Sequence, residues 1–301
     1  MEMGLLESIN GMAMGLVGAP WATALWDLFQ TGLPNYTAEL VAQFRWVIVL
    51  AGMVVGFLVG LTGVGGGTLL TPLLIYLGIP PTTAVGSDLL YGSITKMVGA
   101  YQHFKRGSIH WDWVRYLAAG SIPASLAAVY LLHVVRSHYG SADEMVRLSL
   151  GGVLIVAALL TLGNEAYARY RRQAAPSDPV DPRAHAGKIV LLGAVVGFMV
   201  GLTSLGSGSV VAVALIAFSR FAPSRIVGTN IAHALVLVSA AALAHWQLGT
   251  VDFVLAANLL VGSLPGVVLG SRLAYYTPAR PLKFGMALLV LAGALKMVRI
   301  F

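Results

Sequence analysis

The sequence predicts an all-α, polytopic membrane protein of two inverted repeats, each with a glycine-broken, re-entrant helix and three transmembrane helices. Composition is the first reason: 57% of the 301 residues are hydrophobic and 10% are charged, whereas soluble domains carry about 25% charged residues. The second reason is the length of the segments that contain no charged residue. Residues 46–87 and 189–219 contain no Asp, Glu, Lys, Arg or His, and about 20 apolar residues suffice to cross the hydrocarbon core.

An internal repeat is the third reason. The segment VVGFLVGLTGVGGG at 54–67 recurs as VVGFMVGLTSLGSG at 195–208, and GSIP at 120–123 recurs as GSLP at 262–265. Two related halves that open with glycine-interrupted apolar segments are typical of secondary transporters. The alternative is a duplicated membrane bundle that transports nothing.

The repeat divides the chain into four parts. Residues 1–45 form an N-terminal extension, predicted as an extra helix or as a helix lying at the membrane interface. Residues 46–168 form the first repeat and 188–301 the second. Between them, residues 169–187 form a linker with three prolines and several arginines, which we expect to be exposed and cytoplasmic.

The positions of basic residues favour the inverted arrangement. If each broken segment folds back instead of crossing, the loops at 78–82 and 247–251 lie outside. The same arrangement leaves four basic residues outside, so it does not place every basic residue in the cytoplasm: Arg136, Arg147, Lys296 and Arg299. It does place the following on the linker's side of the membrane: Lys105, Arg106, Arg115, Arg220, Arg225, Arg272, Arg280 and Lys283.

The two glycine-rich breaks are the main candidate site. Irregular backbone at membrane depth is tolerated only where protein or a water-filled cavity satisfies its polar groups. Helices starting near Thr68 and Ser209 would direct unpaired N–H groups and a positive dipole end at a small anionic substrate. We therefore expect the substrate to contact Thr62, Gly65, Gly66, Gly67, Thr68, Thr203, Gly206, Ser207, Gly208 and Ser209. Glycines four residues apart, Gly56 with Gly60 and Gly197 with Gly201, are instead predicted to pack helices closely.

A second polar cluster opens the next helix of each half. We predict that this cluster lines the cavity; its members are Ser87 in the first half and Thr229 and Asn230 in the second. The alternative is that these residues are ordinary N-caps of their helices. Asp88 and Lys96 are charges at membrane depth, where ionisable groups are usually functional. Asp88 is expected to carry a coupling proton or to pair with Lys96, which otherwise offsets the substrate's charge.

Three histidines complete the list of candidates. His233 lies deep in its helix and is the better proton-relay candidate. His103 and His245 occupy matching positions at helix ends, where an interfacial role is favoured over a relay.

The break motifs resemble those of the sulfite exporter TauE/SafE family. The resemblance rests on GLTGVGGGTLLTP at 60–72, LGIPP at 77–81 and AVGS at 84–87, and the second copy fits with VGTN at 227–230. It covers about residues 46–300 and implies a multi-pass permease of the bacterial inner (plasma) membrane. Its implied substrates are small sulfur-containing anions such as sulfite or organosulfonates, exported with proton coupling.

The second copy departs from the richer pattern. Ser207 stands where the first half has its middle glycine, and Val213 where it has Pro72. The two halves are therefore not expected to be functionally identical.

The leading hypothesis is a secondary anion transporter that works by alternating access, with the bilayer and protons as its other partners. A passive anion channel and a permease for a different small organic anion are the alternatives. The sequence holds no HExxH, GxSxG or Walker motif, so we expect no enzyme and no cofactor or metal. The net charge of +7 is explained by basic loops at the membrane surface, so no nucleic-acid partner is expected.

Overall fold

The computed structural model describes residues 45–62, 67–171, 182–219, 221–274 and 294. Within these residues all regular secondary structure is helical, as predicted. The N-terminal extension and the helix expected at the end of the second half lie outside the described residues, apart from Ala294.

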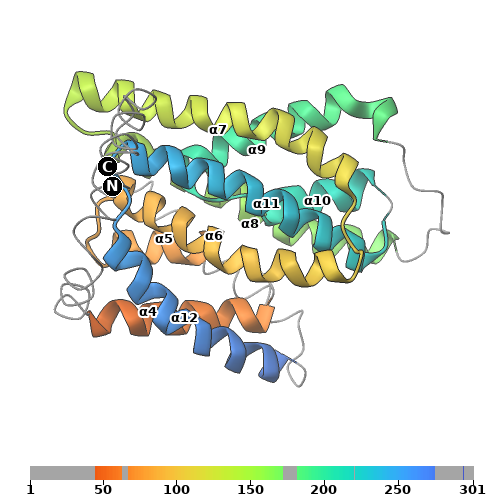
Figure 1. Ribbon diagram of the computed structural model, residues 1–301, viewed down its shortest axis with the longest axis horizontal. Coiled ribbons are helices and arrows are strands. Elements are labelled where there is room, and N and C mark those ends of the chain that lie inside the picture. The colour runs from red at the N-terminus through yellow and green to blue at the C-terminus, as the bar shows by residue number, and fades with distance from the viewer. Residues whose placement is uncertain (1–44, 63–66, 172–181, 220, 275–293, 295–301) are drawn as a thin grey trace, which may run out of the picture. The chain divides into compact units, whose positions relative to one another are not determined.

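Nine α-helices and one short 3-10 helix make up the described part of the chain (Figure 1). The first half contains α4 (Trp46–Thr62), α5 (Gly67–Tyr76), α6 (Pro81–Lys105), α7 (Trp111–Tyr139) and α8 (Asp143–Arg171). The second half contains η1 (Arg183–His185), α9 (Ala186–Thr203), α10 (Ser209–Phe218), α11 (Pro223–Gln247) and α12 (Phe253–Ala274). Helical structure therefore reaches into both ends of the predicted linker, 169–187.

Both predicted breaks separate helices in the structure. One falls between α4 and the ten-residue α5, and the other between α9 and the ten-residue α10. Of the described helical segments, four are long and apolar enough to cross a membrane: Trp111–Tyr139, Arg183–Thr203, Ser224–Gln247 and Phe253–Leu273. The described chain is thus a multi-pass membrane protein.

Prolines and glycines set the helix boundaries. Pro81 and Pro223 stand in the first turns of α6 and α11, where a missing N–H removes no helical hydrogen bond. Gly140 ends α7 with a φ of 78°, a left-handed conformation that glycine adopts without strain. Pro123 and Pro265, which end the repeated GSIP and GSLP motifs, lie inside α7 and α12.

The first helix of each half packs against the fourth helix of the other half. α4 packs along α12, and α9 packs along α7 (Figure 1). Glycines make this approach possible: a Cβ at Gly56 would lie 2.5 Å from the Ser263 carbonyl oxygen, and one at Gly197 would clash with the Ser121 carbonyl. The packing role predicted for these glycines is confirmed.

The register of these glycine contacts gives the helix directions. Along α4, Gly52, Gly56 and Gly60 face Leu259, Ser263 and Val267 of α12 in that order. Along α9, Gly193, Gly197 and Gly201 face Leu117, Ser121 and Ser125 of α7 in that order. Each of the two helix pairs is therefore parallel, and equivalent residues make equivalent contacts.

α6 and α11 pack together between these two pairs, and they are antiparallel (Figure 1). A Cβ at Gly86, near the start of α6, would lie 2.6 Å from the Thr250 carbonyl oxygen, just past the end of α11. A Cβ at Gly228, near the start of α11, would lie 2.5 Å from the Ser108 carbonyl oxygen, just past the end of α6. Each helix thus begins where the other ends.

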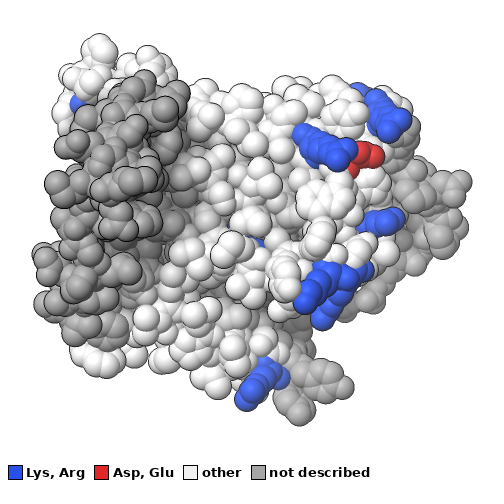
Figure 2. Space-filling model, viewed as in Figure 1, with Lys and Arg blue, Asp and Glu red and all other residues white. Residues whose placement is uncertain are grey.

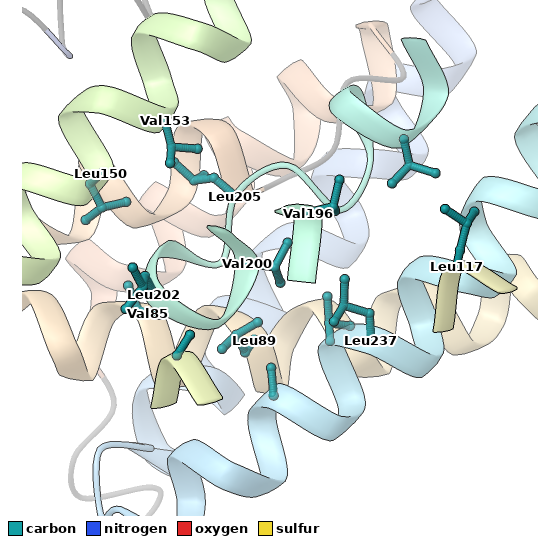
Figure 3. Packing of buried hydrophobic residues seen from close by; sticks show 14 of the residues in the cluster. Val85, Leu89, Leu117, Leu150, Val153, Val196, Val200, Leu202, Leu205 and Leu237 are labelled. Carbon is teal, nitrogen blue, oxygen red and sulfur yellow. The ribbon is translucent and has the colours of Figure 1, made fainter. Parts of the chain in front are cut away.

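The core joins α6, α7, α8, α9 and α11 (Figure 3). Leu89, Leu117 and Leu237 are fully buried within it. Leu205, in the break between α9 and α10, is 1% exposed and belongs to the same cluster. Apolar packing therefore fixes the position of the break itself.

Basic side chains gather at one end of the visible face (Figure 2). The contact between Gly228 and Ser108 brings the start of α11, with Arg225, to the end of α6 that carries Lys105 and Arg106. Large apolar side chains such as Tyr130 and Leu191 are exposed along the helices, at 68% and 66%. This is the pattern expected of helices whose sides face lipid.

Replacing a contact glycine by alanine will destabilise the fold. In Gly56→Ala the new Cβ meets backbone that must shift, and overpacking of this kind costs about 1–3 kcal/mol. Gly152→Ala is the matched control, because a Cβ at that helical position meets nothing within 4 Å. Thermal unfolding in detergent should show a lower midpoint for Gly56→Ala only; equal midpoints would contradict the packing described here.

Candidate functional site

The break between α9 and α10 is a buried turn held by its own polar groups. Ser204 has a φ of 64° and Gly206 a φ of 96°, so the chain leaves α9 through left-handed conformations. The Thr203 hydroxyl donates to the Met199 carbonyl at 2.7 Å and accepts the Leu205 N–H at 3.2 Å. Residues 201–207 are all buried. Such backbone at membrane depth requires polar partners inside the protein.

The start of α5 meets this break. A Cβ at Gly67, the first residue of α5, would lie 3.0 Å from the Ser204 carbonyl oxygen and 3.2 Å from Asp88 Oδ2. The half-helix of the first repeat therefore begins against the break of the second repeat. Only glycine leaves the space for this approach.

Asp88 of α6 ties these two segments together. Its Oδ2 accepts hydrogen bonds from the Thr71 hydroxyl of α5 at 2.6 Å and from the Ser204 hydroxyl at 2.8 Å. The side chain is 2% exposed. Hydrogen bonds to a charged acceptor are roughly twice as strong as neutral ones, so a carboxylate here joins α5, α6 and the second break.

Asn230 of α11 occupies the matching position in the second half. Its Nδ2 donates to the carbonyl of Gly208, the residue that precedes α10, at 2.8 Å. Its Oδ1 is buried and has no hydrogen-bond partner. The second half therefore places a neutral amide where the first half has an acid.

One turn further along, each half has an aromatic side chain close to a serine. His233 Nε2 lies 2.9 Å from the Ser121 hydroxyl of α7, and Tyr91, at the matching position of α6, is buried close to Ser263 of α12. His233 is fully buried, and its Nδ1 has no partner.

Lys96 lies two turns after Asp88 on α6, with no ion pair between them in the described chain. The ion pair found among the described residues, Arg115 with Asp112, is elsewhere. Lys96 Nζ folds back to within 3.3 Å of the Cβ position of Gly92. The ammonium therefore lies on the face of α6 that also carries Asp88. The two side chains are close enough to attract each other electrostatically without forming an ion pair.

Ser87 and Thr229 bond to backbone of the opposite half. Ser87 Oγ accepts the Asp252 N–H at 3.0 Å, and Thr229 Oγ1 accepts the His110 N–H at 2.9 Å. Neither caps its own helix, because α6 and α11 have no side-chain cap. Both hydroxyls secure the point at which a helix of the other half begins.

His103 and His245 also make matching contacts. His103 Nδ1 lies 2.8 Å from the Ser108 hydroxyl, and His245 Nδ1 lies 2.9 Å from the Thr250 hydroxyl. His245 is buried and also bonds to the Gly201 carbonyl at 2.9 Å. The expected interfacial position therefore does not describe His245, whose ring fixes α11 to α9.

The structure gathers part of the expected binding set at the place where α5 meets the second break. Gly67, Thr203, Gly206 and Gly208 lie there, and Thr68 and Ser207 are buried. Gly65 and Gly66 lie outside the described residues, as do the side chains of Thr62 and Ser209. Sequence reasoning missed Thr71, Ser204 and Ser121, although Thr71 lies one turn after Gly67 within the break motif.

Removing the Thr71 hydroxyl will test the Asp88 network. Thr71→Val should lower the free energy of unfolding by about 1.5–3 kcal/mol, the range for hydrogen bonds to charged groups. In an Asp88→Asn background the loss should be smaller, because the charge that strengthens the bond is gone. Ser93→Ala is the control, since that hydroxyl bonds only to the Leu89 carbonyl. Equal losses for Thr71→Val with and without Asp88 would contradict the network.

Comparison with known proteins identifies the family. The family model for "Sulfite exporter TauE/SafE" matches residues 48–297. The chain is 46% identical over 255 residues to "Probable membrane transporter protein YjnA" of Bacillus subtilis, covering 83% of this chain and 98% of that protein. It is 25% identical over 238 residues to "Probable membrane transporter protein YdhB" of the same organism, covering 79% of this chain and 93% of that one.

A plant relative matches over a shorter stretch. "Sulfite exporter TauE/SafE family protein 1" of Arabidopsis thaliana is 26% identical over 125 residues, covering 42% of this chain and 28% of that protein. No solved structure matches this chain. The match of the family model over nearly all of both halves decides the assignment: this chain is a membrane transporter of the sulfite exporter TauE/SafE family.

Proposed function

We propose that this protein is a secondary transporter that exports small sulfur-containing anions, such as sulfite or organosulfonates, across a bacterial inner membrane with proton coupling. Membership of the family supports the class of transport. The observation that carries the mechanism is the buried Asp88, bonded at once to the half-helix of one repeat and to the break of the other.

The halves are proposed to be inverted repeats, and the antiparallel packing of α6 and α11 supports this. These helices are equivalent in sequence, and each begins where the other ends. α4 runs parallel to α12, and α9 runs parallel to α7. Equivalent helices in opposite directions are what inverted repeats require, and such halves can exchange conformations to open a central site to either side.

The proposed orientation places the basic end in the cytoplasm. Lys105, Arg106 and Arg225 share one end of the α6–α11 pair, and Lys and Arg residues favour cytoplasmic loops. Exposed apolar side chains along the helices support a position within the bilayer.

Substrate is proposed to bind where the half-helix starts and the second break converge. The first-turn amides of α5 and α10 have no partners within their own helices. With the helix dipole, they suit a small oxyanion that has left water. Lys96 supplies a positive charge on the same face of α6 as Asp88.

Asp88 is proposed to carry the coupling proton. One carboxylate oxygen accepts both hydroxyls, from Thr71 and from Ser204. Protonation turns the group into a donor and weakens its hold on the second break, which lets the halves rearrange. Coupling matters because moving one charge through 100 mV costs about 2.3 kcal/mol.

Flux in proteoliposomes will test the proposal. A pH gradient should accelerate sulfite or organosulfonate flux by the wild-type protein and drive accumulation. Asp88→Asn keeps the shape of the side chain but cannot exchange a proton, so its flux should stay near the rate without a gradient.

Asp112→Asn is the matched control, because Asp112 is a half-exposed surface acid paired with Arg115; it should behave as wild type. Asp88→Asn flux that still responds fully to the gradient would exclude Asp88 as the proton carrier. Wild-type flux that never accumulates substrate would identify a passive channel.

A further inference from the structure

We propose that the two half-helix starts are not equivalent: the α5 start holds the protein's own carboxylate, and the solute binds at the α10 start. There, Asn230 selects oxyanions that carry a hydrogen-bond donor of their own. This inference rests on the proposed function and specifies its substrate class.

The α5 start already has an anion. Asp88 Oδ2 lies 3.2 Å from the Cβ position of Gly67, the first residue of α5. It also accepts the hydroxyl of Thr71, one turn into the same helix. A carboxylate at a helix N-terminus satisfies the dipole as a bound anion would. A second anion at the same place would be repelled by the first.

The first turn of α10 carries no acid of its own. α10 has no acidic residue in its first turn, and the residue at the position matching Asp88 is the neutral Asn230. Asn230 Nδ2 bonds to the carbonyl of Gly208, so the amide head lies at the start of α10. The helix itself does not use the amides of its first turn, and such amides suit an oxyanion.

Two buried side-chain atoms of α11 lack partners. They are Asn230 Oδ1 and His233 Nδ1, and the two residues lie three positions apart on one face of α11. Buried polar atoms are nearly always hydrogen-bonded, so the unpartnered Asn230 Oδ1, on an amide that lies at the start of α10, points to a missing ligand. An amide oxygen can only accept, which means that the ligand must donate.

The matching residues of the first half are engaged. Asp88 holds two hydroxyls, and neither Asp88 nor Tyr91 is among the described residues with a buried, unpartnered side-chain atom. The unmet hydrogen bonds therefore lie on the α11 side of the site. A solute that combines an anionic oxygen with a donor fits both needs: hydrogensulfite, or a sulfonate bearing a hydroxyl or ammonium group.

A matched pair of ligands tests the donor without any mutation. 2-Hydroxyethanesulfonate and ethanesulfonate share a head group and differ by one hydroxyl. Calorimetric titration of the full-length protein in lipid nanodiscs should show about tenfold tighter binding of the hydroxylated ligand, because the other ligand leaves Asn230 Oδ1 unpaired. Equal affinities would overturn the donor requirement.

Asn230→Asp tests the location. It places a carboxylate at the α10 start, as Asp88 does at the α5 start, and should weaken both ligands at least about tenfold. Asn258→Asp is the control: Asn258 is also buried, but its Oδ1 accepts the Arg45 N–H and its Nδ2 donates to the Val254 carbonyl. It should bind both ligands as wild type does. Thermal unfolding verifies that each variant is folded.

The outcomes separate this inference from the proposed function. Unchanged affinity in a folded Asn230→Asp variant would overturn binding at the α10 start. Absence of binding of either ligand to wild type would overturn it as well. In both cases gradient-driven sulfite flux in proteoliposomes then shows whether the transport proposal stands without it.

Discussion

Backbone that leaves the helix at membrane depth must find its hydrogen-bond partners inside the protein, and the rest of this structure depends on that constraint. α6 and α11 supply the partners. Asp88 holds the Ser204 and Thr71 hydroxyls, and Asn230 holds the Gly208 carbonyl. The side chains that satisfy the breaks include those proposed to meet the solute. Under that proposal, stability and transport draw on the same few groups.

The halves depend on each other for packing. Glycine-to-carbonyl approaches join α4 to α12 and α9 to α7, and small residues allow such backbone contact in the absence of a hydrophobic drive within lipid. Ser87 and Thr229 reinforce this exchange, because each bonds to backbone of the other half. Each repeat thus completes the other.

Much of the fold was predictable, because three of its signals are local in the sequence. These are the glycine-rich breaks, the prolines in the first turns of helices and the long segments without charged residues. Both breaks, the helix starts after them and the packing role of Gly56 and Gly197 follow from these signals. The cross-half contacts were not predictable, since Thr71 and Ser204 become partners of Asp88 only after helices distant in sequence pack together. The alternative ion pair between Asp88 and Lys96 failed for the same reason: spacing along α6 allowed it, but hydroxyls from other segments hold the carboxylate.

The meeting of α5 with the second break is the central claim, and the chain, which contains no cysteine, suits a direct measurement. In Thr71→Cys/Ser204→Cys, oxidation should join the halves, because both native hydroxyls contact one carboxylate oxygen. A protease site placed within 172–181 then yields fragments that stay linked until reduced. Gly99→Cys/Ile231→Cys, across α6 and α11, verifies that oxidation works. Fragments that separate in the first variant but remain linked in the second would contradict the account.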